Sequence, residues 1–174
     1  MKSYKNSNTL AKNYICTLIM GLPGSGKSTI AKKISKLINA YVIDSDHHHS
    51  LKNIHKMKSG LPLNDFDRID WLEKILSNAQ KINKRHVIIA CSALKKKYRD
   101  FLSPLNFKLV YLKIDKVTAR DRILKRKGHF MPISLLESQI SILEEPDESL
   151  IIDARINQKE IVNQIINNIY NIRK

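Results

Sequence analysis

Short apolar runs alternate along the 174-residue chain with longer segments in which apolar residues recur at helical spacing. The runs are residues 15–20, 40–43, 86–91, 107–114 and 150–153. Each run is short and nearly continuous in apolar character, which is typical of strands buried on both faces of a parallel sheet. Because helical segments separate these strands, the pattern predicts an α/β fold in which strands and helices alternate.

The segments between the strands carry the helical pattern. Within residues 28–38, for example, Ile30 and Ile34 begin one apolar stripe. The same pattern predicts helices over residues 52–58, from 69 through 79, around 101–102, and over 116–125, 133–143 and 158–170. Residues 61–68 are predicted to form a polar turn that leads into the 69–79 helix. Trp71 lies off the main stripe of that helix, and we expect it to pack in the core.

Residues 21–29 read GLPGSGKST and match the phosphate-binding pattern G-x-x-x-x-G-K-[ST]. Backbone N–H groups and the positive end of the following helix form an anion cradle there, and Lys27 adds a charge for the outer phosphates. The Ser28 hydroxyl can bind Mg²⁺. A glycine-rich turn that only joins a strand to a helix is the alternative, but the strand before the loop and the helix after it favour a nucleotide site. The predicted cofactor contacts are Gly21, Leu22, Pro23, Gly24, Ser25, Gly26, Lys27, Ser28 and Thr29.

Two carboxylates, Asp44 and Asp46, follow the second predicted strand. Ligands of open parallel sheets bind at the carboxyl ends of the strands, so acids there are candidates for metal or substrate contacts. Residues two apart in an extended chain share a face, which would let both acids work at one site. One of them can also cap the next helix, and the two roles are compatible. The triplet 47–49 is all histidine, but adjacent helical side chains diverge too much to converge on one metal ion.

A basic stretch follows the fifth predicted helix. This stretch begins at Arg126 and Lys127 and is broken by Gly128 and Pro132, while Arg120 and Arg122 lie in the helix that runs into it. Such a stretch does not continue a helix and reads as a loop. A solvated charged face is the alternative. Beside a phosphate-binding loop, a lid over residues 120–132 that closes on nucleotide is the favoured interpretation.

Composition restricts the class of protein further. The length fits one domain over residues 14–174, after a polar and flexible start at 1–13. The formal charge of +15 raises the question of nucleic acid, but the basic residues are scattered and aromatic residues make up only 6%. Nucleic acid is therefore an unlikely partner, and anionic small substrates account for part of the charge.

The remaining composition bears on cellular location. The two cysteines, Cys16 and Cys91, each lie in an apolar run and are predicted to be buried thiols rather than a disulfide. No apolar run reaches the length of a membrane span. We therefore expect a cytoplasmic protein without membrane contact, and the sequence leaves homodimer formation open.

Several motifs, taken together and in order, resemble the gluconokinases of the P-loop kinase type, which are related to shikimate kinase and the nucleoside monophosphate kinases. The motifs are GLPGSGKST, DSD with His49, NIHKMKSGLPLNDFDR at 53–68, CSALKKKYRD at 91–100, RKGHF at 126–130 and LEEPDE at 143–148. They span nearly the whole chain. The chain departs from the family pattern at Ser45 and Ser50, where glycine and proline are usual.

This resemblance implies a three-layer fold with a five-stranded parallel sheet flanked by helices, a helical substrate-binding region over residues 46–68 and the lid. It implies phosphorylation of D-gluconate to 6-phospho-D-gluconate with ATP and Mg²⁺. The catalytic residues would be Lys27, Asp46 and Arg126, with Ser28 and Asp44 at the metal and Arg122 at the nucleotide. The implied substrate contacts are Asp46, His49, Arg68, Ser92, Lys95, Arg99 and Lys127.

Two other functions fit parts of the sequence. The first is a kinase for a nucleotide or another small metabolite, which a substrate panel separates from a gluconokinase. The second is a basic ATPase that binds nucleic acid. Such an ATPase requires salt-dependent binding to polynucleotide and stimulation of its hydrolysis by that polymer.

Overall fold

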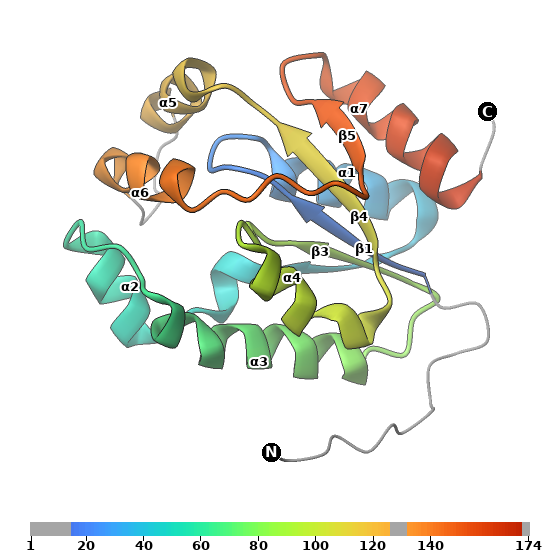
Figure 1. The fold of residues 1–174 in the computed structure, drawn as a ribbon. Coiled ribbons are helices and arrows are strands. Elements are labelled where there is room, and N and C mark those ends of the chain that lie inside the picture. The colour runs from blue at the N-terminus through green and yellow to red at the C-terminus, as the bar shows by residue number, and fades with distance from the viewer. Residues whose placement is uncertain (1–14, 126–131, 172–174) are drawn as a thin grey trace.

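A computed structural model describes residues 15–125 and 132–171, in which a five-stranded parallel sheet lies between two layers of helices (Figure 1). The strand order is β2-β3-β1-β4-β5, and every neighbouring pair is parallel. The strands are β1 (Ile15–Met20), β2 (Tyr41–Asp44), β3 (His86–Ala90), β4 (Lys108–Lys113) and β5 (Leu150–Asp153). The predicted three-layer α/β fold is confirmed.

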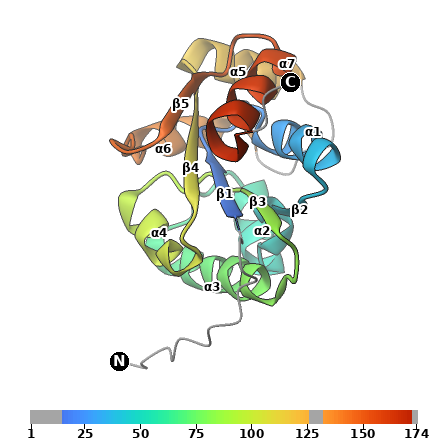
Figure 2. The same cartoon turned by 90° about the vertical axis from the view of Figure 1, so that its right-hand side faces the viewer.

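Helices connect the successive strands and cover both faces of the sheet (Figure 2). The α-helices are α1 (Lys27–Ile38), α2 (Leu51–Lys58), α3 (Asp65–Lys81), α4 (Lys96–Phe101), α5 (Lys116–Lys125), α6 (Leu136–Ser141) and α7 (Gln158–Ile165). Three short 3-10 turns, η1 (Ser45–His48), η2 (Ser103–Leu105) and η3 (Ile133–Leu135), and a π-helical segment, η4 (Ile166–Tyr170), complete the described elements.

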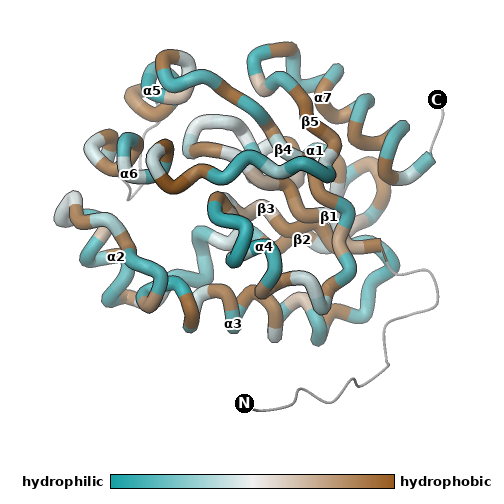
Figure 3. Tube along the Cα trace, viewed as in Figure 1, coloured by the Kyte–Doolittle hydropathy of each residue, from teal (hydrophilic) through white to brown (hydrophobic). Residues whose placement is uncertain are grey.

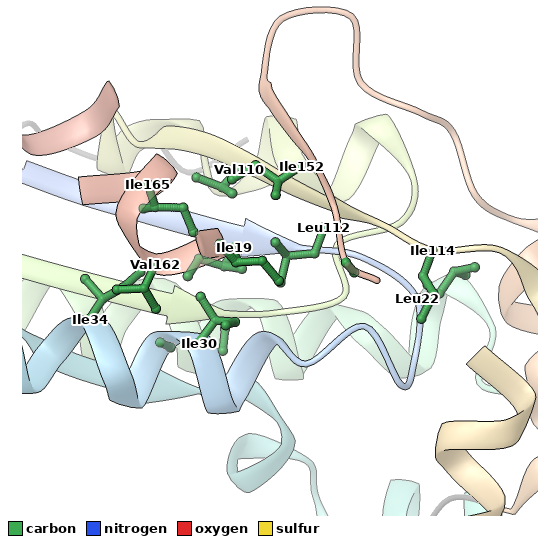
Figure 4. Packing of buried hydrophobic residues seen from close by; sticks show 14 of the residues in the cluster. Ile19, Leu22, Ile30, Ile34, Val110, Leu112, Ile114, Ile152, Val162 and Ile165 are labelled. Carbon is green, nitrogen blue, oxygen red and sulfur yellow. The ribbon is translucent and has the colours of Figure 1, made fainter. Parts of the chain in front are cut away.

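The side chains of β1 alternate between two hydrophobic clusters, one on each face of the sheet. Leu18 and Met20 pack on the side of α3 and α4, whereas Ile19 packs on the side of α1 and α7. Figure 4 shows Ile30 of α1 and Val162 of α7 meeting the sheet in the second of these clusters. Apolar residues concentrate in the central strands, and α3 alternates between polar and apolar positions (Figure 3). Burial on both faces explains why the strands read as continuous apolar runs.

The start of α3 corrects one prediction. The sequence predicts a polar turn over residues 61–68, but the helix already begins at Asp65. The backbone N–H of Asp67 donates to the Asn64 side chain at 2.8 Å, and the backbone N–H of Asn64 donates to the Asp67 carboxylate at 2.9 Å. This reciprocal capping box satisfies two N–H groups of the first turn and fixes the helix start upstream of the apolar stripe.

The segment after the predicted lid also differs from expectation. A single helix was predicted over residues 133–143, but the structure has the 3-10 turn η3 followed by α6, which ends at Ser141. The turn buries Leu135 against Met57 and Leu63 in a third hydrophobic cluster. This cluster brings the segment after residue 131 against the 46–68 region.

Other expectations about the core hold. Cys16 and Cys91 are both buried thiols, and burial raises the pKa of the Cys91 thiol to about 12. Trp71 is 3% exposed and belongs to the cluster under α3. Across the parts of the chain that the structure describes, no helix is long and apolar enough to cross a membrane.

Candidate active site

The phosphate-binding loop joins β1 directly to α1. Gly24 and Gly26 adopt φ angles of 83° and 90°, which residues with a Cβ rarely adopt. A Cβ at Gly24 would lie 2.9 Å from the Ala119 carbonyl oxygen, so the loop packs closely against α5. A Cβ at Gly26 would meet nothing within 4 Å. The loop therefore has open space at Gly26, next to the N-terminus of α1, where a phosphate group fits.

Lys27 folds back over this loop. Its Nζ donates hydrogen bonds to the backbone carbonyls of Gly21 at 2.9 Å and Leu22 at 3.0 Å. The ammonium group is therefore held beside the loop rather than extended into solvent. A point charge in this place complements the anion cradle of the backbone N–H groups.

A cleft of about 480 Å³ opens over the loop at the carboxyl ends of the strands. Residues at or beyond the carboxyl ends of four strands line it. They are Gly26 after β1, Asp44 at the end of β2, Ala90 at the end of β3 and Ala154 after β5. The predicted site residues that line the cleft are Pro23, Gly24, Ser25, Gly26, Lys27, Ser28, Thr29, Asp44, Asp46, His49, Ser92 and Arg122. The structure thus brings the predicted nucleotide loop and the predicted acids into one cavity.

Asp44 and Asp46 reach the cleft by a different geometry from the one expected. Asp44 ends β2, but Asp46 lies in the 3-10 turn η1 rather than in an extended strand. The Asp44 carboxylate accepts a hydrogen bond from the backbone N–H of Asp46 at 3.3 Å and so caps η1. The argument from extended spacing was therefore wrong, although both acids line the cleft. Asp44 therefore caps η1, as expected for one of the two acids, and also lines the cleft.

The two departures from the family pattern fit the local structure. Ser45 is buried in η1 and is absent from the described residues with positive φ, so this position does not require glycine. Its side chain hydrogen-bonds the buried Cys91 thiol. Ser50 is the N-cap of α2, and its hydroxyl accepts from the backbone N–H of Asn53 at 3.2 Å. Both serines are accommodated without strain at these positions.

His49 stacks on the indole ring of Trp71, with the ring centroids 4.8 Å apart and the planes 7° apart. Burial lowers the pKa of His49 to about 4, the Asp46 carboxylate opposes this shift, and the nearby Arg68 charge adds to it. The imidazole is therefore neutral at neutral pH. It lines the cleft as a polar but uncharged group.

Arg122 of α5 connects two sides of the cleft. One terminal nitrogen donates to the Gly24 carbonyl at 3.3 Å and the other to the Ala154 carbonyl at 2.8 Å. The guanidinium group thus links the phosphate-binding loop to the segment after β5. This places a positive charge at the edge of the predicted phosphate position.

Three predicted substrate contacts do not line the cleft. Arg68 is buried, with one terminal nitrogen donating to the carbonyls of Leu63 and Asn64. Arg99 is also buried and donates to the carbonyls of Ala93 and Leu94 at 3.0 Å each. These guanidinium groups have backbone acceptors, which a sequence pattern does not reveal.

Lys95 is the third of these residues. It forms an ion pair of 2.8 Å with Asp65, the first residue of α3. Asp65 also pairs with Lys97 and accepts from the Tyr98 hydroxyl, and these contacts hold its pKa below the usual range. Lys95 thus links the loop after β3 to the start of α3.

Two further predicted nucleotide contacts, Gly21 and Leu22, lie at the base of the loop rather than on the cleft. The predicted roles of Arg126 and Lys127 fall outside the described residues. Sequence reasoning missed eight cleft-lining residues, which are Ile30, Met57, Ala90, Gln139, Ala154, Ile156, Gln158 and Ile161. Four of these follow β5, and the strand-end rule that selected Asp44 would have found them.

The oxygen groups in the cleft suit a magnesium nucleotide. The Ser28 and Asp44 side chains both line the cavity beside the open space at Gly26. Hydroxyl and carboxylate oxygens are the ligands that Mg²⁺ uses together with nucleotide phosphates.

With its phosphate-binding loop between β1 and α1 and acids on the tip of β2, the chain has the architecture of a P-loop kinase. A family profile described as an AAA domain matches residues 17–146. The chain is 43% identical over 147 residues to the thermosensitive gluconokinase of Escherichia coli, covering 80% of this chain and 78% of that protein. It belongs to the gluconokinase family.

Other comparisons agree with this assignment. The thermoresistant gluconokinase of Escherichia coli is 42% identical over 149 residues, which cover 81% of this chain and 84% of that protein. The crystal structure of a gluconokinase from Sinorhizobium meliloti superposes with a TM-score of 0.79 at 33% identity, covering 91% of this chain and 93% of that one. Shikimate kinase from Aquifex aeolicus shares the fold alone, with a TM-score of 0.58 at 18% identity over 87% of this chain and 94% of that one.

Proposed function

We propose that this protein transfers the γ-phosphoryl group of ATP to D-gluconate and forms ADP and 6-phospho-D-gluconate. The observation that carries this proposal is the similarity over most of the chain to proteins named gluconokinase, combined with one cleft that holds the loop and both acids. The two buried thiols are consistent with a reducing compartment, so we propose that the reaction takes place in the cytoplasm.

Phosphoryl transfer requires a protein mainly to align the reacting groups and to neutralise charge on the transferred phosphoryl group. The loop amides between Gly24 and Thr29 would bind the β- and γ-phosphates, and Lys27 is held next to them by its bonds to the loop carbonyls. Arg122 would add a second positive charge from α5. Mg²⁺, held by Ser28 and Asp44, would neutralise part of the phosphate charge when bound.

The acceptor would lie on the opposite side of the cleft, over η1. Asp46 would accept a hydrogen bond from the attacking hydroxyl of gluconate and take up its proton. His49, neutral because it is buried, would donate or accept a hydrogen bond with another hydroxyl group, and Ser92 would do so from the loop after β3.

The gluconate carboxylate requires a positive partner. Arg68 is the better candidate of the two buried arginines, because its charge acts on His49, which lines the cleft. Arg99 instead holds the loop that contains Ser92 and Ala93 through its two carbonyl contacts. A guanidinium group is suited to this task because it can donate two parallel hydrogen bonds to one carboxylate.

The test is ADP release by the purified protein with ATP, Mg²⁺ and one acceptor at a time. The panel contains D-gluconate, other sugar acids, shikimate and nucleoside monophosphates, with a reaction lacking acceptor as the background. We expect gluconate to give the highest kcat/KM, with 6-phosphogluconate as the product. A higher kcat/KM for a nucleoside monophosphate or for shikimate would refute the proposal.

A further inference from the structure

Trp71 makes two separate contacts with the segment that carries the predicted acceptor residues. Its indole N–H donates a hydrogen bond of 2.8 Å to the backbone carbonyl of Ser45. Its ring stacks on His49, with centroids 4.8 Å apart and an angle of 7° between the planes. One side chain thus holds both ends of η1, because Ser45 is its first residue and His49 follows its last.

The carbonyl that Trp71 binds belongs to the peptide group between Ser45 and Asp46. A displacement of this peptide moves the Asp46 backbone directly, and with it the carboxylate that lines the cleft. On its other side, the backbone N–H of Asp46 donates to the Asp44 carboxylate at 3.3 Å. The position of Asp46 therefore depends on the Trp71 hydrogen bond as well as on the Asp44 cap.

Trp71 itself is firmly held. It is 3% exposed and packs in the same hydrophobic cluster as Leu72 and Ile75. Two helical turns further along α3, the Asn78 side-chain amide donates to the ring of His48 at 2.9 Å. Residues seven apart lie on one face of a helix, so one face of α3 supports η1 at two points.

We propose that Trp71 is a positioning residue for the phosphoryl acceptor, which fixes Asp46 through the Ser45 carbonyl and His49 through ring stacking. This inference rests on the proposed kinase function and adds a residue outside the cleft to it. Trp71 does not line the cleft, so it acts through η1. The stacked indole also covers one face of the His49 ring, which agrees with the burial that lowers the pKa of that residue.

The first experiment compares Trp71→Phe with Ile75→Val in steady-state kinetics. Phenylalanine keeps an aromatic ring against His49 but has no N–H for the Ser45 carbonyl. Loss of a buried hydrogen bond corresponds to roughly a tenfold effect, so we expect kcat/KM for gluconate to fall about tenfold. KM for ATP should change less than about twofold, because the hydrogen bond and the ring contact of Trp71 are made with Ser45 and His49, on the acceptor side of the cleft. Ile75→Val removes one buried methyl group from the same cluster and should leave both KM values within about twofold of the parent.

Three outcomes would overturn the role of Trp71. The first is a Trp71→Phe variant with the same kinetics for gluconate as the parent. The second is a Trp71→Phe variant in which KM for ATP rises as much as kcat/KM for gluconate falls. The third is an Ile75→Val variant that loses as much kcat/KM for gluconate as Trp71→Phe does. If the parent phosphorylates another acceptor but not gluconate, the proposed function fails, and the same comparison with that acceptor decides the role of Trp71.

A second experiment requires no variant. Trp71 is the single tryptophan in the sequence, so intrinsic tryptophan emission reports its surroundings alone. Titration of the parent protein with gluconate, up to a concentration that saturates turnover, should change the intensity or the wavelength of this emission. Unchanged emission at saturation would contradict the proposed link between Trp71 and the acceptor.

Discussion

The carboxylate of Asp44 accepts a hydrogen bond from the backbone N–H of Asp46, with 3.3 Å between oxygen and nitrogen. This contact makes the two acids structurally unequal, because Asp44 ends β2 and caps η1, while Asp46 is the second residue of η1. Asp44 is the last residue of β2, whereas Asp46 lies in η1, which Trp71 and Asn78 of α3 contact. This inequality is compatible with our proposal, taken from the family resemblance, that Asp44 binds the metal and Asp46 binds the acceptor hydroxyl.

The two acids should respond differently to neutral substitution. Asp46→Asn keeps the size of the side chain but cannot take a proton, so kcat should fall on the order of a hundredfold while ATP affinity stays near the parent value. Asp44→Asn should raise the Mg²⁺ concentration required for half-maximal turnover, because Mg²⁺ prefers charged oxygen ligands. The measurements are nucleotide binding and turnover against Mg²⁺ concentration.

A surface substitution provides the control for these two variants. Asp100→Asn removes a carboxylate from the exposed side of α4 and should leave both titrations unchanged. The assignment of the two acids is reversed if Asp46→Asn is the variant with the altered Mg²⁺ requirement. It fails if Asp46→Asn turns over gluconate as fast as the parent.

Lys27→Ala should reduce kcat/KM on the order of a hundredfold, because it removes the charge next to the phosphate-binding loop. Ser28→Ala should weaken the response to Mg²⁺, since it removes the hydroxyl ligand. Lys33→Ala, on the exposed side of α1, is the matched loss of one positive charge and should keep parental turnover. Circular dichroism checks that all three variants fold, and parental turnover in a folded Lys27→Ala variant would exclude this lysine from the mechanism.

Hydrophobic periodicity was sufficient to predict alternating strands and helices, because the central strands β1 and β3 are almost entirely buried and therefore read as continuous apolar runs. The edge strands β2 and β5 are partly exposed, and the five-stranded three-layer arrangement came from the family resemblance. The start of α3 was missed, although Asn64 and Asp67 form a recognisable capping pattern. The cleft was predictable in outline, since the loop and the acids both follow strands of a parallel sheet. The hydrogen bonds of Arg68 and Trp71 could not be predicted from the sequence, because their acceptors are backbone carbonyls that only the tertiary fold brings within reach.

The buried histidine predicts a pH dependence of stability. Burial lowers the pKa of His49 to about 4 in the folded protein, whereas the unfolded chain binds the proton near 6.5. Between these values the unfolded state binds more protons, so protonation favours unfolding and the free energy of unfolding falls as pH decreases from about 6.5 to about 4. His49→Gln should show a smaller fall in urea unfolding over this range. An identical pH profile in the two proteins would contradict the lowered pKa.

The two buried arginines give the last prediction, because their contacts separate a structural role from a substrate role. Arg99 donates to the carbonyls of Ala93 and Leu94, and Ala93 has a φ of 40°, so this bonding holds a backbone conformation that alanine rarely adopts. Arg99→Gln should therefore lower the free energy of unfolding by about 2 kcal/mol, in the range for hydrogen bonds to charged groups. Arg68→Gln should instead raise KM for gluconate on the order of tenfold, because the guanidinium near His49 is our candidate partner for the carboxylate. Urea unfolding and gluconate kinetics on both variants test this division. A rise in gluconate KM in Arg99→Gln at parental stability would assign the carboxylate to Arg99 instead.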